Sequence, residues 1–142
     1  MLLWAVGYSG QILAHEQMGS LGKDPDAKDI YYMTCSGGDG TTLLQAAVID
    51  LPPVKQPRVL VRVWRSDVAV AAVDPVDGDT DYSVFTTRRG GSKVYGVSVS
   101  KLPRKAGMSD STRAEMETYN LSYHCSTGPN HTPTDIRIIQ NQ

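Results

Sequence analysis

An acidic loop is the first segment whose residues could bind a metal ion. Asp77, Asp79 and Asp81 alternate along it, and Asp74 lies three residues ahead. Carboxylates at alternate positions of a turn can converge on calcium, which takes about six to eight oxygen ligands. The loop is not an EF-hand, because Tyr82 stands where that motif requires glycine. The pattern therefore indicates either a calcium site at these three aspartates or a turn kept polar for solubility.

Three histidines, His15, His124 and His131, are the other metal-ligating side chains. If an export signal were cleaved after Ala14, His15 would carry the free N-terminal amine. That amine and its imidazole, joined by another histidine, could bind copper. The alternative is three unrelated surface histidines. The strand pattern also predicts that His124 faces away from Cys125, at an exposed position or a sheet edge.

Motifs for catalysis are missing from the sequence. Serine, histidine and aspartate all occur, but no G-x-S-x-G nucleophile motif does. The glycine pairs Gly37-Gly38 and Gly90-Gly91 lack the spacing and the following helix of a phosphate-binding loop, so they predict turns. We therefore expect a protein that is not an enzyme and that has no cofactor, with calcium as the only possible exception.

Cys35 and Cys125 each end a segment of strand-like alternation. Two cysteines in an exported β-protein predict one disulfide, whereas in a cytosolic protein they would be two buried thiols. The bond would close a loop of about 90 residues and contribute on the order of 4 kcal/mol to stability. We expect the disulfide, and with it a periplasmic or extracellular location.

Short segments of alternating polarity dominate the chain from residue 29 onward. They predict an all-β fold, an antiparallel, jelly-roll-like β-sandwich of about seven to eight strands. At most one short helix is expected, in the segment 103–118, and Arg88–Gly91 is expected to be a hairpin turn. The expected strands are Asp29–Cys35, Leu43–Leu51, Arg58–Arg65, Asp67–Val73, Tyr82–Thr87, Lys93–Leu102, Tyr119–Cys125 and Ile136–Ile139.

The faces of these strands can be assigned from their alternation. In Arg58–Arg65 three valines alternate with Leu60, Arg62 and Trp64, which must face the other side. In Tyr119–Cys125 the residues Tyr119, Leu121, Tyr123 and Cys125 share one face. The alternation predicts that Cys125 and the tyrosines beside it point into one core.

Length and charge restrict the class of protein. The chain has 142 residues and a net charge of −1, which fits one domain and does not support nucleic-acid binding. No apolar run approaches the roughly 18 residues of a membrane span. Residues 1–14 are apolar and uncharged, and could be an export signal or a first strand. Residues 15–142 are expected to form the single domain.

Four segments resemble the bacterial pre-peptidase C-terminal (PPC) domain, a secreted β-sandwich. They are Asp29–Met33, Arg58–Trp64, Gly90–Val99 and Tyr119–Tyr123, within residues 29–125. The resemblance implies an adhesive or accessory role, sometimes with calcium, and no catalysis. The chain departs from the family in its cysteine pair, in the segment 103–118, and in the lack of a protease domain within the 142 residues.

The sequence thus predicts an exported, non-catalytic binding or accessory module. Its ligand could be a protein or a polysaccharide. The alternative function is a periplasmic or secreted protein that binds calcium or copper.

Overall fold

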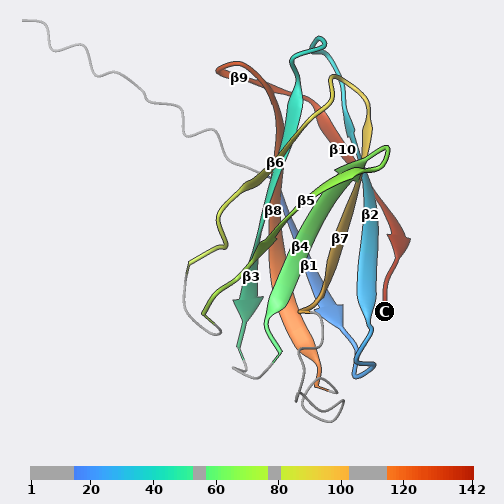
Figure 1. The fold of residues 1–142 in the computed structure, drawn as a ribbon, viewed down its shortest axis with the longest axis vertical. Coiled ribbons are helices and arrows are strands. Elements are labelled where there is room, and N and C mark those ends of the chain that lie inside the picture. Colours follow the sequence, from blue (N-terminus) through green and yellow to red (C-terminus); the bar gives the residue numbers. More distant parts are fainter. Residues whose placement is uncertain (1–14, 53–56, 77–80, 103–114) are drawn as a thin grey trace, which may run out of the picture.

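The computed structural model describes residues 15–52, 57–76, 81–102 and 115–142, and they form two antiparallel β-sheets packed face to face (Figure 1). The all-β sandwich is therefore confirmed. The described residues form ten strands and no helix. Of the segment expected to hold a helical turn, residues 103–114 lie outside the described residues, and its last two residues begin a strand.

Sheet A has the strand order β1-β8-β3-β6, with β9 also paired to β8. Sheet B has the order β10-β2-β7-β4-β5. The strands of sheet A are β1 (His15–Leu21), β3 (Leu43–Leu51), β6 (Thr86–Arg89), β8 (Glu117–Thr127) and β9 (Asn130–Thr132). Those of sheet B are β2 (Lys28–Cys35), β4 (Val59–Arg65), β5 (Val68–Val73), β7 (Val94–Lys101) and β10 (Thr134–Gln140).

The core lies between the two sheets and consists of the side chains at alternate positions of their strands. The predicted inward faces of β4 and β8 are buried, because a half-buried strand turns every second side chain inward. The centre consists of valines, tyrosines and the cysteine pair contributed by both sheets. Its largest fully buried side chains include Tyr95, Tyr119, Met33, Leu44, Leu121, Val61 and Val97.

Cys35 and Cys125 form the predicted disulfide, with their Cα atoms 5.6 Å apart. Cys35 ends β2 in sheet B, whereas Cys125 lies in β8 of sheet A. The bond therefore joins the two sheets across the core, beside Tyr31 and Tyr123, which belong to the same buried cluster.

The predicted hairpin at Arg88–Gly91 is wrong. β6 pairs with β3 in sheet A, whereas β7 lies between β2 and β4 in sheet B, so the chain crosses from one sheet to the other. Gly91 makes the crossing with a φ of 81°, which glycine adopts without steric cost. The hydroxyl of Tyr95 donates a 2.7 Å hydrogen bond to the Gly91 carbonyl and holds the crossing in place.

Two strands lie where the sequence predicted none. β1 is an edge strand paired only with β8 and has little apolar alternation, because most of its residues are exposed or half-buried. β9 lies between the expected strands Tyr119–Cys125 and Ile136–Ile139 and follows a tight turn at Gly128, whose φ is 57°. Both strands form by pairing with β8, and their own sequences show no pattern typical of a strand.

Candidate ligand-binding face

The outer face of sheet B carries a groove that follows β7. After Val94 at its start, the outward residues of β7 are small: Gly96, Ser98 and Ser100. Larger outward side chains stand on both sides of this row, because β7 lies between β2 and β4. The residues of each wall follow from the register, which sets Ile30 and Arg62 on either side of Ser98. A row of small residues between two larger rows forms a shallow channel along the sheet.

Trp64 occupies one part of this groove. Its indole lies over Gly96, so near that a Cβ added to Gly96 would be 2.1 Å from the ring atom Cε2. Tyr32 pairs with Gly96 from the other side, and its ring is 44% exposed. Glycine at this position therefore lets the indole lie against the sheet, with a second aromatic ring across the groove.

A hollow of about 330 Å³ opens beside Trp64. Polar and charged groups surround the one aromatic ring, and Asp67 stands at the end in the turn between β4 and β5. A second hollow of about 180 Å³ lies on the other side of Tyr32, towards β10. The first hollow is lined by Lys28, Ile30, Arg62, Trp64, Ser66, Asp67, Ala69 and Ser98. The two hollows lie on the same outer face of sheet B, an arrangement that suits an extended ligand.

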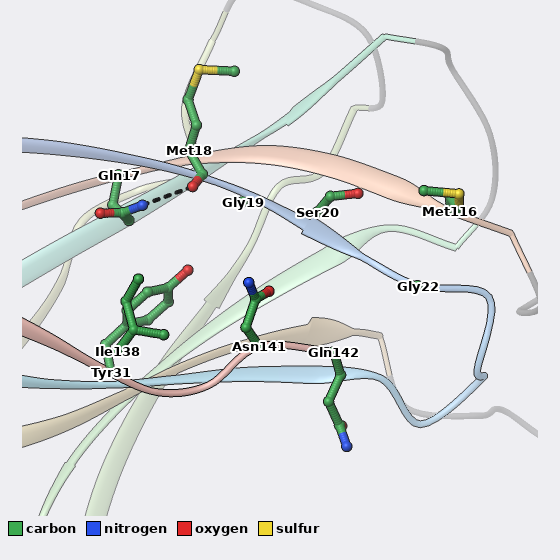
Figure 2. A pocket seen from close by; sticks show the side chains of 10 residues that line it. All are labelled: Gln17, Met18, Gly19, Ser20, Gly22, Tyr31, Met116, Ile138, Asn141 and Gln142. Atoms are coloured by element: carbon green, nitrogen blue, oxygen red, sulfur yellow. Dashed lines mark hydrogen bonds between the residues drawn. The ribbon is translucent and has the colours of Figure 1, made fainter.

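A third hollow, of about 370 Å³, lies between the sheet edges β1 and β10 (Figure 2). Figure 2 shows Tyr31 and Asn141 pointing from the sheet B side towards β1. The Tyr31 and Tyr119 hydroxyls are hydrogen-bonded to each other behind this hollow. Tyr119 can lie there because residue 19 is glycine: a Cβ would be 2.2 Å from the Tyr119 hydroxyl.

Most polar groups of this third hollow already have partners within the chain. The Gln17 amide donates to the neighbouring Met18 carbonyl, and the Gly22 N–H donates to the carbonyl of Gln142. Gln142 in turn donates its own N–H to Asp29. These bonds fasten the last residue of the chain to the end of the sandwich. The hollow is therefore part of the fold's framework, and we place the candidate site on sheet B.

The pKa values of the two buried tyrosines reflect the same framework. Burial raises the pKa of Tyr119 far above its usual value of 10.0, and its hydrogen bonds to Asp29 and Tyr31 add to this rise. Burial also raises the pKa of Tyr31. Both phenols are thus neutral donors at any physiological pH, which suits a structural role.

The structure brings two of the three predicted histidines into contact. The rings of His124 and His131 stack with centroids 4.7 Å apart, and Phe85 packs edge-on against His124 at 5.5 Å. His15 stacks on Tyr123 at 5.5 Å. His124 does face away from Cys125, but it is half-buried in the middle of sheet A, so its predicted exposure is wrong. Burial lowers the pKa of His124, and the charges of His131 and His15 lower it further.

The predicted metal sites stay predictions. Asp77 and Asp79 lie outside the described residues, and Asp81 is exposed. Asp74 is buried instead, and its carboxylate accepts a 2.7 Å hydrogen bond from the Asp50 N–H. Within the described ranges, no group of three or more His, Cys, Asp or Glu side chains is arranged to hold a metal ion.

The sequence predicted part of the candidate site. Alternation placed Arg62 and Trp64 together on the outward side of their strand, and the structure confirms this orientation. It did not connect them with Lys28, Tyr32 or Ser98, because these lie on other strands. The available signal was the spacing Gly96-x-Ser98-x-Ser100, small residues on the outward side of an otherwise apolar strand.

Comparisons with family models, curated proteins and solved structures found no match. Among the residues that the structure describes, there is no helix long and apolar enough to cross a membrane.

Proposed function

We propose that this protein is an exported, non-catalytic binding module and that a polysaccharide occupies the groove on sheet B. The observation that carries the proposal is the position of Trp64: an indole held over Gly96 in an outward groove. The face of a sugar ring is lined with C–H groups and its rim with hydroxyls. An aromatic ring surrounded by hydrogen-bonding side chains fits both parts.

The composition of the groove favours a sugar over a protein partner. The centre of a protein interface is usually apolar and poor in charged residues. Here charged Lys28 and Arg62 and polar Ser98 lie beside the single indole. A second hollow lies beyond Tyr32 on the same outer face, so a chain of sugar units could reach both.

The disulfide supports export, because disulfides persist in oxidising compartments and are rare in the cytosol. The resemblance of the strands Asp29–Met33 and Tyr119–Tyr123 to the PPC domain is in keeping with an accessory role in a secreted protein. Binding without chemistry also fits the lack of a nucleophile motif in the sequence.

Native gel electrophoresis through gels that contain one polysaccharide each tests the proposal. Xylan, mannan, β-glucan, alginate and polygalacturonate are suitable probes. We expect at least one of them to retard the wild-type protein, and Trp64→Ala to abolish that retardation. Phe85→Ala is the matched control, because it removes an exposed aromatic ring that packs against sheet A and not sheet B. Retardation of W64A equal to wild type, or no retardation in any gel, would refute the proposal.

A further inference from the structure

Two cations face each other across the groove that holds Trp64. Arg62 on β4 is set beside Ser98, and Lys28 on β2 is set beside Ser100, one outward position further along β7. Both side chains are exposed. In the described part of the chain, neither of them forms an ion pair with a carboxylate. Their charges are therefore available to a ligand that lies over Ser98.

Two carboxylates of this face lie towards its other end. Asp67 is in the turn beyond Trp64, and Asp135 pairs with Thr34, beyond the row of Tyr32 and Trp64. Among the residues that line the groove, the two cations therefore lie around Ser98 and Ser100, and Asp67 lies at the end beyond Trp64.

Arg137 adds a third cation to the outer face. It pairs with Tyr32 and is exposed, so its guanidinium lies on the β10 side of the aromatic row. The cations therefore stand at intervals across β4, β2 and β10, rather than in one compact cluster. Such spacing suits repeated single charges along a polymer better than one multiply charged small molecule.

We infer that the ligand is an acidic polysaccharide, whose uronate carboxylates bind Arg62 and Lys28 while a sugar ring packs against Trp64. The inference rests on the proposed function and names its ligand class. Arginine suits this role because its planar guanidinium can donate two parallel hydrogen bonds to one carboxylate. Stacking on Trp64 alone would not distinguish acidic from neutral sugar chains. The charges of Arg62 and Lys28 then favour the acidic ones by electrostatic complementarity.

Nucleic acid is the other extended polyanion that such a face could attract. The net charge of −1 and the acidic end at Asp67 disfavour it, because nucleic-acid sites usually lie in a strongly basic surface. It is therefore an outcome of the test and not the proposal.

Isothermal titration calorimetry can compare two forms of one polymer, polygalacturonate with free carboxylates and the same preparation fully methyl-esterified. The backbone is identical and only the charge differs. We expect the free acid to bind at least about tenfold more tightly, since a charge-assisted hydrogen bond contributes about that much. The preference should shrink as NaCl rises from low to high concentration, because salt screens exposed charges.

Paired variants assign the effect to the groove. K28Q/R62Q should lose the preference for the free acid and keep any binding of the ester. K23Q/R89Q removes the same charge from positions outside the groove and should behave like the wild type. Binding both polymers equally, or a neutral polysaccharide instead, would overturn the inference and leave the proposed function standing.

Failure to bind any polysaccharide, neutral or acidic, would instead overturn the proposed function itself. Binding of single-stranded DNA as tightly as polygalacturonate, with competition between the two, would show a face for polyanions in general and would overturn the inference of a sugar ligand.

Discussion

The phenol of Tyr119 donates a 2.6 Å hydrogen bond to the buried carboxylate of Asp29, and this bond links the two sheets. Tyr119 belongs to β8 in sheet A and Asp29 to β2 in sheet B. The other oxygen of Asp29 accepts a 2.7 Å bond from the backbone N–H of Gln142. One carboxylate therefore holds both sheets and the last residue of the chain, and it must keep its donors because an unpaired buried polar group is costly.

We expect Tyr119→Phe to lower the free energy of unfolding by about 2 kcal/mol, because it removes a donor from a buried carboxylate and leaves the ring in place. Urea denaturation followed by circular dichroism measures the change. Tyr123→Phe is the control: that ring is also buried, but its hydroxyl makes no hydrogen bond within the described residues. Equal losses in the two variants would show that the Asp29 bond contributes nothing particular.

The disulfide should contribute more than any single hydrogen bond. Its cysteines are 90 residues apart, so reduction releases a long loop in the unfolded chain. In the chain-entropy model the loss is about 4 kcal/mol. Urea denaturation with and without a reductant, and of the variant C35A/C125A, measures it. Labelling of two thiols in the untreated protein would show that the disulfide does not form. An unfolding free energy that is the same with and without reductant would show that the disulfide does not stabilise the fold.

The contact between Trp64 and Gly96 can be tested by a double-mutant cycle. Gly96→Ala alone should destabilise the protein by about 1 to 3 kcal/mol, because the new methyl group would overlap the indole. In a Trp64→Ala background the same change should be neutral or stabilising, since alanine is normally favoured over glycine within a strand. The coupling measured in urea then reports this contact alone.

Gly40→Ala is the control for this cycle, because a Cβ there would meet nothing within 4 Å. It should give the same small effect with and without Trp64. If Gly96→Ala cost the same in both backgrounds, the indole would not lie over Gly96 in solution, and the proposed groove would lose its aromatic wall.

The sequence predicts which side of each strand is buried, but not which strands share a sheet. Alternation with period two is a local property, so the inward valines of β4 and the inward face of β8 could be assigned correctly. The choice of sheet depends on pairing with distant strands. The segment Arg88–Gly91 has the glycines of a hairpin, yet its flanking strands β6 and β7 lie in different sheets.

The same limit applies to the candidate site and to β1. The outward positions of Trp64 and Arg62 follow from one strand, whereas the groove needs β2 and β7 beside them. β1 has almost no apolar pattern, because an edge strand with one partner buries few side chains. The cysteine pair was predictable because each cysteine ended a segment of strand-like alternation in the sequence.

The stacked pair of His124 and His131 should make stability depend on pH below neutrality. The pKa of His124 is lowered from 6.5, first by burial and then by its histidine neighbours, and its cross-strand partner Gln45 carries no charge to offset this. The unfolded chain therefore takes up a proton below pH 6.5 that the folded protein does not. Linkage then requires the free energy of unfolding to fall as the pH drops from 6.5 towards the lowered pKa.

Urea denaturation between pH 7.5 and 5 measures this fall, and His124→Gln should reduce it because glutamine is polar but does not titrate. His15→Gln should change the fall less than His124→Gln does, because His15 is exposed, lies outside the stack and lowers the pKa of His124 only through its charge. NMR titration of the His124 ring protons gives an independent reading of the same pKa. A midpoint at or above 6.5, or parallel stability curves for wild type and H124Q, would show that stacking against His131 and Phe85 does not hold the imidazole neutral.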